Sequence, residues 1–234
     1  QRHQNAQKYV EDVWHCMKLM KLTDPSIKLI ANGESGNKEW TKTALKGLDG
    51  AIDYISYHAY VGTNSPCPYS IFQKIQGQDT WMREFAEMVK ATVPDTVQNW
   101  KKWYRFPHRT APVKIALDEW GIWEQQEPPY GTTNTYEWRH GLATACFLNA
   151  ILHNAEHIGM ANWAQMVNLL APIMTNTQTS VKPTVFFPLK EYRIQSLKES
   201  VQAKAQSPII EEGLQSINVS ATIDRDKKQM TVNI

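Results

Sequence analysis

Apolar residues recur along this chain in two patterns that predict strands separated by helices. Short, nearly continuous apolar runs predict four buried strands, over residues 27–31, 52–60, 113–119 and 159–167. Apolar residues at helical spacing predict helices over residues 5–22, 70–103 with a break at Pro94, 137–155 and 186–200, and helix-forming residues occupy 40–45. Buried strands that alternate with helices are typical of parallel βα units.

The pattern changes beyond residue 206. Apolar and polar residues alternate over 217–223 and again over 230–234, and the polar segment 224–228 separates the two runs. This arrangement predicts an antiparallel β-hairpin. We therefore expect one domain over residues 1–205 and the beginning of a second, all-β domain over residues 206–234.

Four βα strands are too few to close a barrel, which needs eight strands. The chain also begins with a predicted helix that no strand precedes. Two architectures remain open at this point. One is an open four-stranded α/β sheet, and the other is the second half of a (β/α)8 barrel.

Composition limits the classes of partner. The 234 residues carry 25 basic and 23 acidic side chains, and this balance predicts neither a nucleic-acid nor a membrane-surface partner. No apolar run reaches the length that spans a membrane. Three widely spaced cysteines argue against a disulfide framework or a zinc cluster and favour a reducing, cytoplasmic location. The first residues show no signal-peptide pattern, and the absence of an initial Met leaves the native start open.

Candidate chemistry is concentrated in residues 114–123, KIALDEWGIW. An apolar strand leads directly into Asp118 and Glu119, followed by Trp120 and Trp123. Barrel enzymes place catalytic groups at the carboxyl ends of their strands, and tryptophans pack well against the C–H faces of a sugar ring. The simpler alternative is that one of the two acids caps the next helix.

The ends of two other strands carry further candidates. His58 and Tyr60 are two residues apart on an extended strand and therefore share a face; a lone His is more often a core residue. Gln165 lies near the end of the fourth predicted strand. His153 and His157 have the i, i+4 spacing of metal ligands, but without a third ligand nearby they predict no metal site.

Four segments together resemble consecutive blocks of the family 51 glycoside hydrolases, which are retaining α-L-arabinofuranosidases with a (β/α)8 barrel. They are DPSIKLIANG (24–33), DYISYHAY (53–60), IALDEWGIW (115–123) and MANWAQMVN (160–168), and ACFLNA (145–150) and APIMT (171–175) also fit. The resemblance implies that residues 1–205 form the C-terminal half of the barrel, from the helix after strand 4 through helix 8. Residues 206–234 then begin a β-sandwich.

The resemblance also implies roles at the strand ends. Glu119 matches the nucleophile, and His58 and Tyr60 match a pair that orients the nucleophile or the sugar. Trp123 matches an aromatic wall of the sugar pocket, and Gln165 matches a residue that hydrogen-bonds the arabinose, although it could equally be a capping amide. Adjacent strand residues face opposite sides, so we expect Asp118 to be structural, and we interpret two further tryptophans as packing residues, Trp120 and Trp163.

One feature of the family pattern is missing. The family's general acid/base, a Glu that follows Asn at the end of the fourth strand, has no counterpart in this chain. Glu34 and Glu39 belong to the loop after the fifth strand, where the family has no such residue, and we reject both. The resemblance therefore implies that a separate N-terminal half-barrel completes the site.

The activity implied is removal of terminal α-L-arabinofuranosyl residues from arabinoxylan or arabinan by double displacement. The substrate partner is then an arabinose-containing oligo- or polysaccharide. The resemblance implies no cofactor and is compatible with a homo-oligomer. Two alternatives stay open: the same scaffold with endoglucanase or xylosidase specificity, and a catalytically incompetent fragment that lacks its acid/base.

Overall fold

The computed structural model describes residues 5–63, 65, 67–93, 109, 111–124, 136–211 and 213–234. The chain divides into two compact units. Unit 1 comprises residues 1–58, 83–118 and 157–160, and unit 2 comprises residues 59–82, 119–156 and 161–234. The division falls between residues 58 and 59, between residues 118 and 119, and between residues 160 and 161.

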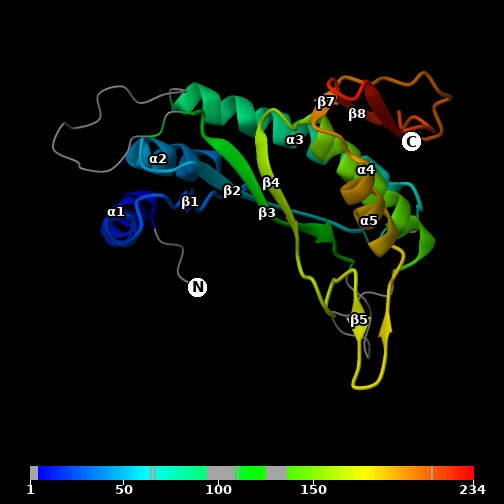
Figure 1. Cartoon of the computed structure of the whole chain (residues 1–234), viewed down its shortest axis with the longest axis horizontal. Coiled ribbons are helices and arrows are strands. Elements are labelled where there is room, and N and C mark those ends of the chain that lie inside the picture. The colour runs from blue at the N-terminus through cyan, green and yellow to red at the C-terminus, as the bar shows by residue number, and fades with distance from the viewer. Residues whose placement is uncertain are drawn as a thin grey trace. The chain divides into compact units, whose positions relative to one another are not determined.

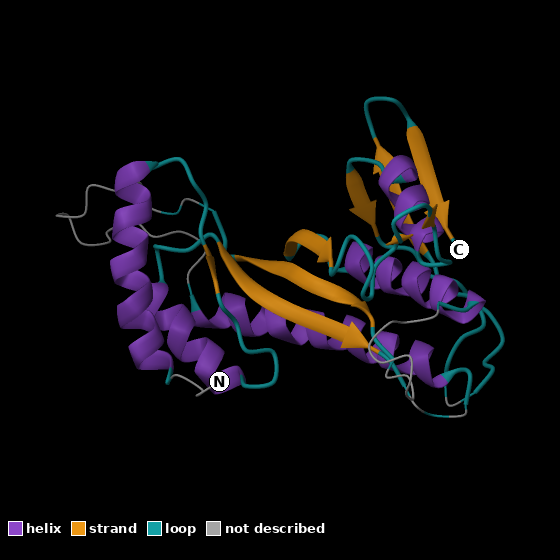
Figure 2. Cartoon of the chain, turned by 90° about the horizontal axis from the view of Figure 1, so that it is seen from below, coloured by secondary structure: helices purple, strands orange, loops and turns teal. Residues whose placement is uncertain are grey.

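Helices and strands alternate along most of the chain (Figures 1 and 2). In chain order the elements are α1 (Ala6–Thr23), β1 (Ile30–Ala31), α2 (Lys38–Leu48), β2 (Tyr54–Val61), α3 (Ser70–Thr92), β3 (Lys114–Ile122), α4 (Trp138–His153), β4 (Ile158–Trp163), β5 (Met174–Thr175), β6 (Ser180–Val181), α5 (Phe186–Gln195), β7 (Glu199–Val201), β8 (Ser220–Asp224) and β9 (Gln229–Asn233). The four strands predicted for the first domain are present. The predicted continuation of α3 through residue 103 lies outside the described residues.

Strands β1 to β4 are hydrogen-bonded in sequence order. β1 and β2 are parallel, with Ile30 opposite Tyr54. In unit 1 the Ile115 amide donates to the His157 carbonyl at 2.9 Å, and in unit 2 the Ala164 amide donates to the Trp120 carbonyl at 3.1 Å. From the first of these bonds to the second, the residue numbers rise on both β3 and β4. The two strands are therefore parallel, as the sequence predicts.

The first strand is shorter than the predicted range 27–31. Asp53 accounts for the difference, because its side chain accepts a hydrogen bond from the Leu29 amide at 2.9 Å. The Leu29 carbonyl in turn accepts from the amides of Asp53 and Tyr54 at 2.9 and 3.1 Å. A side-chain bond thus replaces one ladder bond, and regular pairing begins only at Ile30.

Helix α1 of unit 1 begins where Asn5 caps it. The Asn5 side chain accepts from the Lys8 amide at 2.8 Å, a bond that satisfies one unpaired donor of the first turn. The Trp14 indole donates to the Gly47 carbonyl of α2 at 2.9 Å. This contact joins the two helices.

In unit 2, α5 lies along α4 (Figure 1), and β7, β8 and β9 form an antiparallel sheet. The hairpin predicted beyond residue 206 is confirmed as β8 and β9. The predicted last helix, 186–200, is too long: Ser196 is extended, with φ −66° and ψ 135°. Glu199–Val201 instead pairs with β8, and the Leu197 amide donates to Thr222 Oγ1 at 2.9 Å.

The fourth predicted strand, 159–167, ends early as β4 at Trp163. The hairpin of β5 and β6 follows it and is absent from the sequence prediction (Figure 1). Asn176 forms its turn, because Asn176 Oδ1 accepts from the amides of Gln178 and Thr179, both at 2.8 Å. Within the described residues, none of the helices combines the length and the apolar character needed to cross a membrane.

Candidate active site

Glu119 and Tyr60 are joined by a hydrogen bond in unit 2. Tyr60 is the penultimate residue of β2, and its hydroxyl donates to Glu119 Oε2 of β3 at 3.0 Å. Burial, and secondly the hydrogen bond to Glu119, raise the pKa of the Tyr60 hydroxyl to about 12. Tyr60 therefore stays protonated at neutral pH and remains a donor to the carboxylate.

Trp123 follows β3 directly and stands beside this pair. Its ring meets the Tyr60 ring edge to face, with centroids 5.3 Å apart and an interplanar angle of 82°. The Trp123 amide donates to the Val61 carbonyl at 2.8 Å, which continues the ladder past the last strand residue. Trp123 is 42 % exposed, and an aromatic wall that receives a sugar ring needs such accessible surface.

Gly62 makes this approach of the two strand ends feasible. A Cβ atom at Gly62 would lie 1.8 Å from the Trp123 carbonyl oxygen and 2.5 Å from its carbon. Any residue other than glycine would push the two backbones apart. The sequence offers only a glycine after an apolar strand as a signal for this contact.

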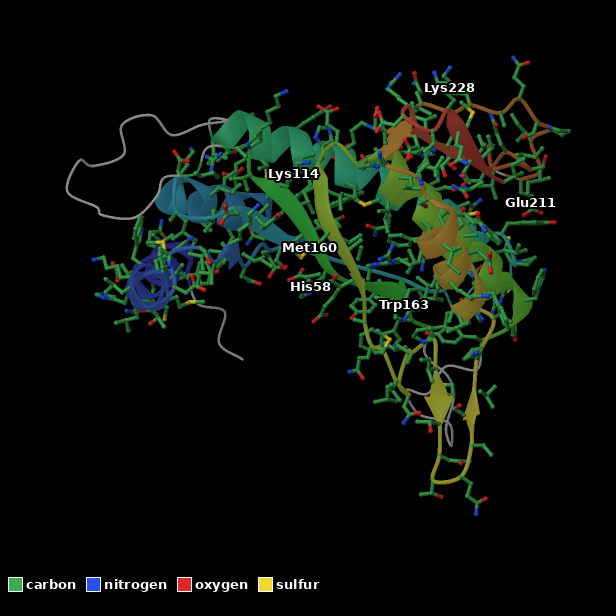
Figure 3. All side chains as sticks on the ribbon, viewed as in Figure 1. His58, Lys114, Met160, Trp163, Glu211 and Lys228 are labelled. Carbon is green, nitrogen blue, oxygen red and sulfur yellow. The ribbon has the colours of Figure 1, made fainter. Side chains whose placement is uncertain are left out.

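Trp120 and Trp163 pack against each other. Trp120 is 2 % exposed, stacks on Phe147 with centroids 4.8 Å apart, and meets Trp163 edge to face at 5.0 Å. The Trp163 indole donates to the Leu170 carbonyl at 2.8 Å. Trp163 ends β4, where Figure 3 labels it. These contacts agree with the packing roles expected from the sequence.

Gln165 lies two residues beyond the end of β4 and is exposed. Its expected hydrogen bond to arabinose stays a prediction.

His58 and Asp118 belong to unit 1. Asp118 Oδ1 accepts from Ser56 Oγ at 2.7 Å and lies 3.5 Å from His58 Nε2. Ser56 and His58 flank Tyr57 on β2, so they share one face of that strand, and Figure 3 labels His58 there. The contact with Ser56 supports a structural role for Asp118, and the role expected for His58 stays a prediction.

A buried ionic cluster, absent from the sequence analysis, lies next to Trp123. Glu124 Oε2 accepts from Arg139 Nη2 at 2.9 Å and from His140 Nε2 at 3.0 Å, and Glu124 Oε1 accepts from the Thr63 amide at 3.2 Å. We call these four residues the Glu124 cluster. A Glu in the loop after a strand gives no signal of partners 15 and 16 residues away.

The two rejected acids lie in unit 1, near the start of α2. Glu39 forms an exposed ion pair with Lys42 at 2.7 Å, and the Glu34 backbone bonds to Thr41 Oγ1. Among the residues that the structure describes, no group of three or more His, Cys, Asp or Glu is placed to hold a metal ion.

Comparison with known proteins connects this geometry to a family. The model of the α-L-arabinofuranosidase C-terminal domain matches residues 118–234, which is half of the chain. The chain belongs to the α-L-arabinofuranosidase family. The match begins at Asp118, directly before Glu119, and the resemblance inferred from the strand-end motifs is confirmed.

Curated relatives agree with this assignment. An intracellular exo-α-(1→5)-L-arabinofuranosidase of Halalkalibacterium halodurans is 29 % identical over 220 residues, covering 87 % of this chain and 42 % of the relative. A probable α-L-arabinofuranosidase C of Aspergillus niger is 28 % identical over 200 residues, covering 77 % of this chain and 37 % of the relative. The chain thus spans less than half the length of these relatives.

Solved structures share the fold. The α-L-arabinofuranosidase of Thermotoga maritima, in complex with arabinose, aligns with a TM-score of 0.80 at 23 % identity, covering 98 % of this chain and 47 % of that chain. The family 51 enzyme AbfB of Bifidobacterium longum aligns with a TM-score of 0.79 at 19 % identity, covering 96 % and 49 %. The predicted fold class, a partial (β/α)8 barrel followed by the first strands of a β-sandwich, is confirmed.

Proposed function

We propose that this chain is the nucleophile-bearing part of a retaining α-L-arabinofuranosidase. The observation that carries the proposal is the hydrogen bond from Tyr60 to Glu119 at the carboxyl ends of two neighbouring parallel strands, beside the open indole of Trp123. Barrel enzymes assemble their sites at these strand ends. The family membership of the chain supports the same activity.

In the proposed reaction, a Glu119 carboxylate oxygen attacks the anomeric carbon of the arabinofuranosyl group. A new C–O bond forms as the glycosidic C–O bond breaks, and a second carboxyl group protonates the departing oxygen. Water then cleaves the glycosyl ester, with the second group now acting as base. Tyr60 holds one oxygen of Glu119, which limits rotation of the carboxylate and fixes its direction of attack.

The sugar is held by aromatic surface and hydrogen bonds. Trp123 offers an exposed ring for the C–H face of the furanose, and Gln165 is assigned a hydrogen bond to a sugar hydroxyl. His58 is assigned an orienting role for the nucleophile or the sugar. The general acid/base is assigned to a part of the fold outside this chain, which agrees with relatives of which the match covers 42 % or less.

Arabinoxylan or arabinan is the proposed substrate. The names of the relatives from Halalkalibacterium halodurans and Streptomyces lividans specify exo-α-(1→5)-L-arabinofuranosidase activity, which favours terminal arabinofuranosyl groups. Both names also specify an intracellular protein, and this supports the cytoplasmic location expected from the cysteines.

Hydrolysis of aryl α-L-arabinofuranosides by the chain tests the proposal. We expect turnover of an aryl glycoside with a good leaving group, and loss of that turnover in Glu119→Gln. A poor leaving group should be slower by a further factor of about 10²–10⁴, because the proposal assigns the general acid to a part of the fold outside this chain. The matched control is Asp118→Asn, which changes the neighbouring acid. Equal turnover by the parent chain and Glu119→Gln would contradict the proposal.

A further inference from the structure

The Glu124 cluster is a buried carboxylate with three donors. The Glu124 side chain is 11 % exposed, and those of Arg139 and His140 are 30 % and 5 % exposed. Glu124 Oε2 accepts hydrogen bonds from Arg139 and His140 of α4, and Glu124 Oε1 accepts one from the Thr63 amide. Glu124 therefore ties the end of β3 to the segment after β2 and to the first turn of α4.

The proton on His140 has a defined position. His140 Nδ1 accepts from the Glu137 amide at 2.8 Å, so this nitrogen carries no hydrogen. The hydrogen is then on Nε2, which lies 3.0 Å from Glu124 Oε2 and donates to it. His140 is thus a directed donor to Glu124, and hydrogen bonds hold its ring at both nitrogens.

Hydrogen bonds and a close backbone contact restrain the main chain at Trp123 and at the residue before it. The Trp123 amide donates to Val61, its carbonyl lies against Gly62, and the Ile122 carbonyl accepts from the Tyr136 hydroxyl at 3.2 Å. Glu124 supplies the remaining restraint, one residue past the indole. Trp123 is 42 % exposed whereas Trp120 is 2 % exposed, so packing fixes the Trp123 ring less and its backbone restraints matter more.

We propose that Glu124 is a positioning residue that sets the place of Trp123 and, through the ring contact with Tyr60, the alignment of Glu119. The Glu124 cluster restrains the backbone next to Trp123, and the Trp123 ring contacts the Tyr60 ring. The Tyr60 hydroxyl in turn donates to Glu119. Glu124 touches no reacting atom in this scheme. The link to sugar binding rests on the proposed function, whereas the link from Glu124 to Trp123 does not.

Fluorine NMR of the 234-residue chain labelled with 5-fluorotryptophan tests the proposal. Trp123→Phe assigns the Trp123 signal among the nine tryptophans. We expect Glu124→Ala to shift or broaden the Trp123 signal while those of Trp120 and Trp163 stay in place. Glu124→Gln, which keeps one acceptor oxygen, should give a smaller change. The matched control is Glu199→Gln, which removes an exposed carboxylate bonded to Arg225 at 2.9 Å and should leave the Trp123 signal unchanged.

Two further arms separate the positioning role from the proposed function. Titration of the parent chain with L-arabinose should move the Trp123 signal, and Glu124→Ala should lower kcat/KM for an aryl arabinofuranoside by up to about 100-fold. An unchanged Trp123 signal in Glu124→Ala would overturn the positioning role whatever the sugar does. A signal that responds to Glu124 but not to arabinose would support positioning and contradict the proposed function.

Loss of fold has its own control. If Glu124→Ala collapses the dispersion of all tryptophan signals, Glu124→Gln decides the question. A folded Gln variant with the parent Trp123 signal and the parent kcat/KM would overturn the proposal. A folded Gln variant with a selectively altered Trp123 signal would support it.

Discussion

The Tyr60 hydroxyl donates to Glu119 Oε2 at 3.0 Å, so a residue near the end of β2 sets the orientation of the acid on β3. The two strands are neighbours in the parallel sheet but are separated by the whole of α3 in sequence. Parallel pairing therefore brings together a donor and an acceptor 59 residues apart.

Replacement of Tyr60 by Phe should slow the first chemical step. A hydrogen bond to a charged group contributes about 1.5–3 kcal/mol, so we expect kcat to fall roughly 10- to 100-fold, with a smaller change in KM. Tyr54→Phe, at the other end of the same strand, is the matched control. Steady-state kinetics with an aryl arabinofuranoside measure both variants, and parent kinetics in Tyr60→Phe would show that the hydroxyl does not orient the nucleophile.

Gly62→Ala should destabilise the chain strongly. The added Cβ would lie 1.8 Å from the Trp123 carbonyl oxygen, and the backbone there must move. We expect a loss of about 3 kcal/mol or more in the free energy of unfolding, in the range of severe overpacking. Gly77 in α3 is the control, because a Cβ there meets nothing within 4 Å. Gly77→Ala should raise the free energy of unfolding by about 0.5–1 kcal/mol, because Ala has a higher helix propensity than Gly. In urea denaturation, Gly62→Ala should be less stable than the parent chain and Gly77→Ala more stable.

Asn149 joins α4 to the C-terminal sheet of unit 2. Its Oδ1 accepts from Tyr192 at 2.7 Å and from Ser220 at 2.5 Å, and its Nδ2 donates to Asn218 at 2.6 Å. Asn149 is 2 % exposed and its partner Ser220 is 0 % exposed, so truncation removes an acceptor from a buried hydroxyl. Asn149→Ala should lower the free energy of unfolding by roughly 2–4 kcal/mol.

Asn233→Ala is the control for Asn149, because it removes one bond to Ser220 at the edge of the same network. We expect it to cost less than 1 kcal/mol, about the value of one hydrogen bond. Thermal and urea unfolding measure both variants. Equal small losses would show that the Asn149 side chain does not join the two elements.

Alkaline pH should lower the free energy of unfolding even before the buried Tyr and Cys side chains ionise in the folded chain. Burial raises the pKa of Tyr57 to about 12 and that of Cys146 to about 11, and burial together with Glu119 raises the pKa of Tyr60 to about 12. The ordinary values are 10.0 for Tyr and 9.0 for Cys. The unfolded chain thus releases these protons first, and the stability that they provide is complete below about pH 9.

That stability should fall from about pH 9 as Cys146 contributes, and further from pH 10 to 12 as the tyrosines contribute. Urea denaturation from pH 8 to 11 measures the loss. Cys146→Ala should remove the part that begins near pH 9. A free energy of unfolding that stays constant to pH 11 would contradict the burial of these groups.

The sequence predicts the parallel strands well because each is an apolar run between turn residues, and parallel pairing buries both faces. It also places Glu119, Tyr60 and Trp123 at strand ends, where the structure joins them. It misses β5 and β6, because a two-residue strand has no periodicity. It extends the last helix to residue 200, because residues 199–201 form strand β7 only through pairing with β8.

The Glu124 cluster was beyond sequence reasoning for a different reason. Its acid lies in a loop and its basic partners lie on the next helix, so no spacing rule connects them. The same applies to Asp118, whose contacts with Ser56 and His58 depend on the twist and reach of side chains at the strand ends. Contacts of this kind can be identified only when the three-dimensional positions of the strands are known.

The most direct test of the account is to locate the covalent intermediate. The chain is mixed with an activated aryl α-L-arabinofuranoside, quenched in acid and digested, and its peptides are mapped by mass spectrometry. We expect one pentosyl group esterified to Glu119, and no labelled peptide in Glu119→Gln. A label on Asp118 or another residue, or no label while the aryl group is released, would contradict the claim that Glu119 is the nucleophile.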